Sequence, residues 1–476
     1  MDEVEVMEQV ELIENETECG EWVADELSKV ALGDKRLDWR LLDSAAKLAA
    51  RPTMSINQAC DDWADTKATY RLFANEKTTH AKILGPHMVR TQARMGQYER
   101  CLAIQDTTFL DYTHHPGKAG MGPIGTTKQG LSGLVMHSTL VTNLDGLPLG
   151  VLSEQIWSRD ETPKQLTPEE RRKVPIEEKE SHKWLVGLRA SVQQQPKQTQ
   201  LITVGDSEAD LFELFDCARH LKTDLLLRAG QDRSVCEPEV GRLWATLEAQ
   251  PSAGQLAVHV PKREQQPARD TTVCVRYLSL SLQAPKHLRA TMGPVALYGI
   301  LVQEVDPPAA VEPLCWLLLT TVPVTCFDDA VERIEWYCHR WQIEIFHKIL
   351  KSGCRIEAVQ LAADDRLKPL IALYSVIAWR LFWVTFLART QPDAPATTIL
   401  APHELQALYH FHHRRPLPLA AAPTVQQATR WIAQLGGFLN RKGDGDPGVT
   451  VIWRGWQRLA DIADAFLAFR PPPTYG

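Results

Sequence analysis

The middle of the chain opens with short apolar runs that predict strands. Residues 101–104 form a continuous apolar run, which is typical of a buried strand, and Asp106 follows at its carboxyl end. Residues 136–142 and 147–152 flank Asn-Leu-Asp-Gly, which is a hairpin signal and predicts a strand on each side. Together these segments predict a three-stranded meander.

Helical and strand patterns alternate in the next stretch. Residues 177–195 repeat apolar positions at helical spacing, and the apolar run 201–205 ends directly before Asp206. A short helical pattern leads to another apolar run at residues 224–229. Strands that first form hairpins and then alternate with helices predict an α/β fold: a mixed sheet with helices on its faces.

The stretch at about 231–315 is longer than one helix and one strand require, which indicates an insertion. Apolar positions alternate with polar ones over residues 273–282, and prolines punctuate the stretch, so the insertion is expected to be rich in strands. Residues 316–321 then predict a return to the main sheet.

The N-terminal part is predicted to be helical and locally basic. Residues 1–20 are rich in acids and contain no Lys or Arg, which predicts a solvated lead-in. Between residues 33 and 95, 11 Lys and Arg outnumber 7 acids. Apolar residues recur there at helical spacing, and Ser55 can cap a second helix that runs through Tyr70 and Phe73.

The C-terminal part is also predicted to be helical. The long apolar run 370–388 is interrupted by Arg380 and predicts a buried helix rather than a membrane span. The histidine cluster from His410 to Arg415 has two interpretations, a polar connector or a metal site, and the connector is favoured because no second cluster accompanies it.

Composition and charge narrow the class of protein. The 476 residues are 44% hydrophobic and 23% charged, as in a soluble globular protein of two or three domains. A net charge of −7 excludes a protein that is basic throughout, so nucleic-acid binding requires local basic patches. The 10 cysteines include no Cys-x-x-Cys pair, which disfavours a zinc site or a disulfide framework and favours reduced thiols.

Residues 337–351 carry the strongest chemical pattern. On one continuous helix, Tyr337, Arg340, Glu344 and Lys351 would share a stripe about 60° wide, opposite an apolar face. A carboxylate flanked by two cations and a phenol suits phosphoryl transfer, because the acid can hold a metal and the cations can hold phosphate oxygens. A solvated, salt-bridged helix face is the alternative.

The spacing of these four residues resembles the YREK signature of the insertion-sequence-four family of DDE transposases, transposon-five type. We call residues 337–351 the signature segment. ALGDKRL and YRLFAN resemble the family's N-terminal domain, GDSEAD resembles its second acidic motif, and residues 433–456 resemble its C-terminal dimerisation segment. The resemblance implies a ribonuclease-H-like core with a β-strand insertion.

The implied domains are an N-terminal helical DNA-binding domain at 1–90, a catalytic domain at 91–365 and a C-terminal helical dimerisation domain at 366–476. Asp106, Asp206 and Glu344 are the expected catalytic carboxylates and metal ligands. Three oxygen ligands suit two Mg²⁺ ions per site, with Mn²⁺ able to substitute. Asp111, Glu208 and Asp210 are neighbouring acids that compete for the assignment.

The resemblance also implies DNA contacts. Tyr337 and Arg340 are expected to hold phosphates around the cleavage point, and Lys351 to hold the terminal backbone. Arg228 corresponds to a DNA-contacting arginine, and Trp316 is placed to stack on a flipped base, although it can equally be a core residue. Phosphate contacts from the N-terminal domain are expected from Lys35, Arg36, Arg40, Arg51, Lys67 and Arg71.

The predicted function is cut-and-paste DNA transposition, with hydrolysis, hairpin formation and strand transfer at the ends of the element. The expected partners are transposon-end DNA, target DNA and a second copy of the chain in a synaptic homodimer, with no membrane involved. The expected location is the bacterial cytoplasm, at the nucleoid. The alternatives are a domesticated DNA-binding protein that no longer transposes and a metal-dependent nuclease or phosphatase on the same fold.

Overall fold

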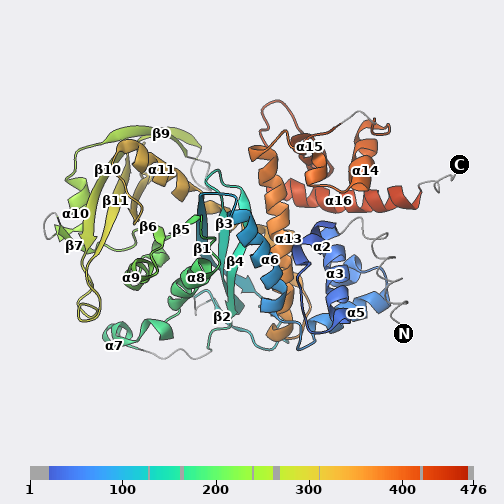
Figure 1. Cartoon of the computed structure of the whole chain (residues 1–476), viewed down its shortest axis with the longest axis horizontal. Coiled ribbons are helices and arrows are strands. Elements are labelled where there is room, and N and C mark those ends of the chain that lie inside the picture. The colour runs from blue at the N-terminus through green and yellow to red at the C-terminus, as the bar shows by residue number, and fades with distance from the viewer. Residues whose placement is uncertain are drawn as a thin grey trace.

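The computed structural model describes residues 21–126, 129–160, 166–237, 241–260, 268–309, 311–418 and 422–469. The predicted acidic lead-in, residues 1–20, lies outside them. Figure 1 shows a large sheet on one side, helices from both ends of the chain on the other, and one long helix between them.

The N-terminal helices are α2 (Glu21–Leu27), α3 (Lys35–Ala50), α4 (Ile56–Ala59), α5 (Trp63–Phe73) and α6 (His80–Met95). Ser55 caps a helix as predicted, with Gln58 completing a capping box. The continuous helix predicted from Ser55 to Phe73 is wrong, however. The chain leaves the helical conformation at Cys60, and the Asp62 side chain caps a new helix by accepting from the Asp65 N–H.

The strands are β1 (Arg100–Asp111), β2 (Gly122–Ile124), β3 (Leu131–Thr142), β4 (Pro148–Trp157), β5 (Gln200–Gly205), β6 (Asp224–Arg228), β7 (Ser234–Glu237), β8 (Gly241–Arg242), β9 (Gly254–Val260), β10 (Arg269–Leu282), β11 (Val295–Glu304) and β12 (Cys315–Thr320). Among the described residues they form one twelve-stranded sheet in the order β2-β3-β1-β5-β6-β12-β11-β10-β7-β8, with β4 also paired to β3 and β9 to β10. The sheet is mixed, as predicted, because β1, β5 and β6 run parallel while β3 and β12 run antiparallel to their neighbours.

The predicted meander of β1, β3 and β4 is confirmed. The prediction that Asp106 ends its strand is wrong, because β1 continues to Asp111. Beyond Ile104 the strand loses β5 as a partner and remains paired to β3 alone. The stretch 231–315 is rich in strands as predicted, and β10 and β11 extend the main sheet through β12.

Two hydrophobic clusters cover the two faces of the central strands. Leu225 and Leu227 pack into the cluster of Trp184 and Phe215, whereas Leu226 between them packs into the larger cluster. Neighbouring residues of a strand point to opposite faces of the sheet, so β6 is buried on both faces, as its three consecutive leucines predict. The helices that contribute to the smaller cluster include α8 (His182–Gln193), α9 (Phe212–Leu221) and α10 (Leu243–Glu248), while α7 (Pro168–Lys173) lies at the edge of the fold (Figure 1).

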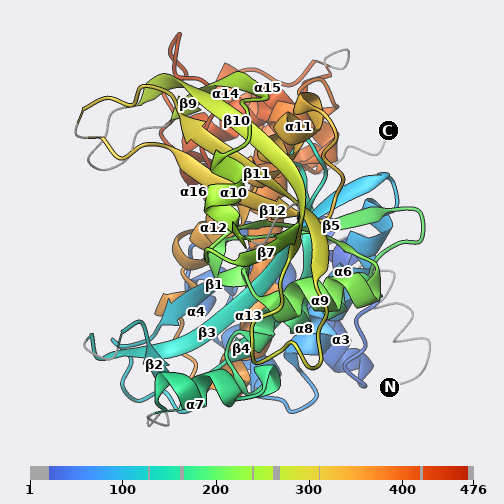
Figure 2. The same ribbon diagram turned by 90° about the vertical axis from the view of Figure 1, so that its left-hand side faces the viewer.

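The long helix is α13 (Asp364–Thr390), and it packs against α6, β4 and the C-terminal helices. Among the described residues it is the one helix long and apolar enough to cross a membrane, but 83% of its most apolar window is buried inside the fold. The C-terminal helices are α14 (Pro402–His413), α15 (Val425–Leu435) and α16 (Val449–Ala468); α15 and α16 pack on α13, and α14 packs on both of them. Figure 2 shows the same arrangement from the side of the sheet.

The signature segment is not one helix. The helix α11 (Phe327–Cys338) carries Tyr337 and ends before Arg340, α12 (Trp341–Lys348) carries Glu344, and Lys351 lies in a π-helical turn, Ile349–Gly353. The single stripe calculated for a continuous helix is therefore wrong. The apolar face is confirmed, because Ile343, Phe346 and Leu350 are fully buried.

Candidate active site

Asp106 and Asp206 lie beside each other at one edge of two parallel strands. The last parallel pair of β1 and β5 is Ile104 with Val204, and each aspartate follows two residues later. Asp206 begins a short turn and its Oδ1 accepts from the Glu208 N–H at 2.9 Å. The sequence therefore brings these two carboxylates together through strand register alone.

Helix α12 brings the third carboxylate. His347 Nε2 lies 3.4 Å from Ser138 Oγ, and Ser138 is the β3 residue directly opposite Asp106. The buried Phe346 and His347 thus fix α12 against the sheet next to Asp106. Glu344, one turn earlier, is more exposed, with 38% of its side chain accessible.

Asp106 is influenced electrostatically by both of the other carboxylates. Burial raises the pKa of Asp106 to about 7, and the negative charges of Asp206 and Glu344 act in the same direction. The Thr107 N–H, which donates to Asp106 Oδ1 at 2.7 Å, and the Arg340 guanidinium act in the opposite direction. A buried carboxyl surrounded by like charges needs a cation to ionise fully.

Arg340 supplies part of that positive charge. Its guanidinium donates to Glu344 Oε1 at 2.7 Å and lies 3.9 Å from Asp106 Oδ2. The side chain is 10% exposed. Burial acts to lower the pKa of Arg340, but the hydrogen bond to Glu344 and the charges of Tyr337, Glu344 and Asp106 together raise it. Arg340 therefore holds Glu344 and faces Asp106 at the same time.

The donor set fits a hard divalent cation in its chemistry, since all three side chains offer carboxylate oxygens. In the conformation described, however, no group of three His, Cys, Asp or Glu side chains among the described residues is close enough to hold a metal ion. Glu344 is turned to Arg340 instead. The His410–Arg415 cluster forms no such group either, and His412 stacks on Trp431 with ring centres 5.5 Å apart.

Three of the expected DNA contacts gather beside the carboxylates. Tyr337 is buried and its ring lies edge-on to Trp316, with centres 5.7 Å apart. Burial raises the pKa of Tyr337 to about 12, and the charges of Arg340, Arg228 and Asp206 all reach it. Tyr337, Trp316 and Arg228 therefore lie close together, and the exposed Arg228 is open to a ligand.

Lys351 lies farther along β1. Its Nζ donates to the Phe109 carbonyl at 2.8 Å and lies 3.3 Å from Glu357 Oε1. The same Glu357 oxygen accepts from the Asp111 N–H at 2.9 Å. Glu357 was not predicted, since no local pattern distinguishes it from other acids, yet it fixes Lys351 against the strand that carries Asp106.

The competing acids have other partners. Asp210 is 1% exposed, pairs with Arg233 at 2.7 Å and accepts from two backbone N–H groups. Asp111 accepts from the hydroxyl and N–H of Thr113. Glu208 faces Lys183 at 3.7 Å. These contacts support the choice of Asp106 and Asp206.

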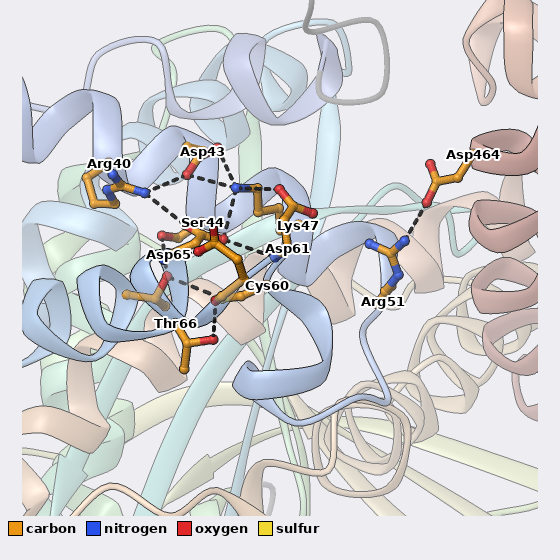
Figure 3. A network of polar contacts seen from close by, with 12 residues as sticks. Arg40, Asp43, Ser44, Lys47, Arg51, Cys60, Asp61, Asp65, Thr66 and Asp464 are labelled. Carbon is orange, nitrogen blue, oxygen red and sulfur yellow. Dashed lines mark hydrogen bonds and ion pairs between the residues drawn. The ribbon is translucent and has the colours of Figure 1, made fainter. Parts of the chain in front are cut away.

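The predicted N-terminal phosphate contacts divide into two groups. Figure 3 shows Arg40 between Asp43 and Asp65, at 3.0 and 2.9 Å, and Arg51 bonded to Asp464 of α16. Both cations are therefore already paired. Lys47 lies at the centre of the same network. This role was not predicted, because nothing in the sequence distinguishes Lys47 from the other cations of this basic region.

The other four predicted contacts, Lys35, Arg36, Lys67 and Arg71, are exposed. Their side chains form no ion pair with the rest of the described chain, although Lys67 lies over the Trp63 ring at 5.1 Å. These four cations are available to a phosphate backbone.

Comparison with protein families places two functional units on this fold. Residues 20–78 match the family model described as Transposase DNA-binding, and residues 376–469 match the model described as Transposase Tn5 dimerisation domain. The matches support a Tn5-type transposase, a DNA-processing enzyme with DNA as a partner and with homodimer formation. The first match contains all six predicted N-terminal contacts, and the second contains α14, α15 and α16.

Proposed function

We propose that this protein is a DDE transposase of the insertion-sequence-four family that catalyses cut-and-paste transposition on a ribonuclease-H-like core. One observation supports the proposal: Asp106 follows the same strand register as Asp206 and is reached by the charge of Glu344, in a chain whose N-terminal part matches a DNA-binding model and whose C-terminal part matches a dimerisation model. The substrates are transposon ends and target DNA, which places the protein with the bacterial nucleoid in the cytoplasm.

The three carboxylates would hold two Mg²⁺ ions, or Mn²⁺ in their place, which activate the attacking oxygen and stabilise the leaving one. Water attacks the phosphodiester at the element's end, and the freed 3′-hydroxyl then attacks the opposite strand to form a hairpin. A second water opens the hairpin, and the same hydroxyl joins target DNA. Each step exchanges one phosphorus–oxygen bond for another.

Arg340 is the phosphate-binding residue nearest the carboxylates. A phosphate oxygen that replaces Glu344 beside the guanidinium would satisfy Arg340 equally well, because Arg binds phosphate and carboxylate with the same forked geometry. The replacement would free Glu344 to turn toward Asp106 and Asp206. DNA binding would thereby complete the catalytic site.

Tyr337 and Arg228 extend the phosphate-binding surface around Arg340, and Lys351 continues it along β1. Trp316, packed against Tyr337, is the residue on which an unstacked base could rest. The paired homodimer brings two such sites to the two ends of the element in one synaptic complex.

The test is strand cleavage on a denaturing gel, with Mg²⁺ and a linear DNA that carries the element's own ends. We expect a nick at the end followed by a hairpin, and loss of both in Glu344→Gln. Glu335→Gln, which changes an exposed acid on α11, is the matched control and should cut normally. Sequence-specific binding without cleavage by the wild type, in Mg²⁺ or Mn²⁺, would instead identify a domesticated DNA-binding protein.

A further inference from the structure

A groove of about 360 Å³ lies between the N-terminal unit and the turn that follows the signature segment. Residues 53–58 and Tyr70 form one wall, and Cys354, Arg355 and residues 358–360 form the other. The first wall belongs to the region that matches the DNA-binding model, and the second begins just beyond Lys351. A ligand in this groove would touch both units.

Arg355 is the cation of this groove. The residue is exposed, and its side chain forms no hydrogen bond or ion pair with any part of the chain that the structure describes. Its backbone is left-handed, with φ 50° and ψ 38°, a conformation in which glycine is favoured and a branched or long side chain costs about 1 kcal/mol or more. Glycine could replace Arg355 without a conformational cost, so the contribution of the guanidinium can be tested by itself.

The turn that carries Arg355 is fixed to the catalytic strand. The Tyr112 hydroxyl donates to the Ile356 carbonyl at 3.2 Å, and Glu357 joins Lys351 to the Asp111 N–H. Arg355 is thus held at a constant position relative to β1 and Asp106. A phosphate bound by Arg355 would have a set distance to the site of cleavage.

We propose that this groove binds the sugar-phosphate backbone of DNA, with the Arg355 guanidinium on a phosphate and the exposed Asn57 side chain on the opposite side of the same strand. This inference rests on the proposed function and adds a contact to it. The remaining wall is polar and uncharged at Ser55 and Gln58, as suits a backbone contact that does not read bases. A strand seated there would align the end held by the N-terminal unit with the catalytic carboxylates.

Arg355→Gly is the main test variant, because glycine accepts the left-handed backbone and removes only the side chain. Lys222→Gly is its matched control: Lys222 is also exposed and cationic, with φ 54°, but it ends α9, which lies on the opposite side of the molecule from α3 and α5 (Figure 1). Both variants should unfold at or above the wild-type temperature.

Binding is measured by fluorescence anisotropy over a range of salt concentrations, with a labelled duplex that carries the element's terminal sequence. We expect Arg355→Gly to weaken binding about 3- to 10-fold and to reduce the slope of log affinity against log salt by about 0.9, the value for one phosphate contact. Lys222→Gly should change neither quantity.

A second pair of variants tests the opposite wall. Asn57→Glu places a negative charge in the groove and should weaken binding by a similar factor, whereas Asn57→Gln should bind like the wild type. An Arg355→Gly protein with the affinity and salt slope of Lys222→Gly overturns the groove assignment while leaving the transposase proposal intact. A wild-type protein that binds no DNA overturns both.

Discussion

The N-terminal helices and the signature segment both carry cations expected to contact phosphate, but they hold these cations differently. In the N-terminal unit, Arg40 and Arg51 are paired with aspartates that have no part in the candidate site, while Lys67 and Arg71 form no ion pair with any described residue. In the signature segment, Arg340 is paired with Glu344, itself a candidate catalytic residue.

The ion pairs in these two regions serve different purposes: one set stabilises the fold, and the other involves a candidate catalytic residue. The aspartates around Arg40 and Lys47 join α3 to α5, so their pairing stabilises the fold. The pair of Arg340 and Glu344 joins two neighbouring residues of one segment and must open if Glu344 is to hold a metal. Local excess of positive charge therefore does not identify which cations are available to DNA.

The largest expected effect is that of Arg340→Ala. Loss of a charged donor at the reacting phosphate should reduce strand cleavage about 10²- to 10³-fold, with little change in thermal stability because Glu344 is already 38% exposed. Single-turnover cleavage measures the effect, and Lys348→Ala on the exposed side of α12 is the control. Cleavage within about twofold of the wild type would remove Arg340 from the site.

The next effect concerns a buried ion pair that joins α2 to α6. Burial acts to raise the pKa of Glu26, but hydrogen bonds from His87 and Arg94 lower it to about 2 from the usual 4.5. Because the folded-state pKa is depressed, its stabilisation is present above about pH 4.5 and is lost as the pH falls toward 2. Glu26→Gln should cost on the order of 3 kcal/mol at pH 7, and the difference from the wild type should shrink at acidic pH in urea unfolding. An equal difference at pH 7 and pH 3 would contradict this assignment.

The free N-terminal cations should affect binding and leave stability unchanged. The double variant Lys67→Ala and Arg71→Ala should reduce the salt slope of DNA binding by about 1.8, and its unfolding free energy should remain within about 0.5 kcal/mol. Anisotropy titrations at several salt concentrations, paired with urea unfolding, measure the two quantities. A lower stability with an unchanged slope would show that these cations are structural.

Lys47→Met should lower the stability and leave the salt slope of DNA binding unchanged, and it is the smallest of the expected effects. Asp43, Asp61 and Asp65 all lie within 3.1 Å of Lys47. Burial acts to lower the pKa of Lys47, but hydrogen bonds to these three aspartates raise it. Removal of the ammonium should lower stability by about 1 kcal/mol, because the network is partly exposed, while the salt slope stays the same. A reduced slope would place Lys47 among the DNA contacts.

Much of the sheet could be predicted because its strands are buried on both faces. Residues 201–205 and 225–227 are mostly apolar for that reason, and Asp206 ends its strand as expected. Asp106 is different, since β1 continues along β3 after it leaves β5, and no local pattern marks the loss of one partner.

The residues of the candidate site remain a prediction from the sequence, and the geometry expected for them differs in the structure. Helical spacing placed Tyr337 and Glu344 on one stripe, whereas a tight turn at Arg340 and a π-helical turn at Lys351 shift the phase of the helix. Pairing of Arg51 with Asp464, 413 residues away, depends on tertiary contact and has no local signal. Gly436 and Gly455 also depend on tertiary contact. A Cβ atom at either position would collide with the backbone of the helix packed against it, and no local sequence pattern reveals this contact.

The central claim is that Asp106, Asp206 and Glu344 hold the metal when DNA is bound. Fe²⁺ placed in the site with peroxide and ascorbate cuts the polypeptide near its ligands, and the fragments can be mapped by mass spectrometry without reference to transposition. The account predicts cuts around residues 106, 206 and 344 in the DNA complex, which Mg²⁺ suppresses and Glu344→Gln weakens. Cuts elsewhere, or the same cuts at full strength in Glu344→Gln, would contradict it.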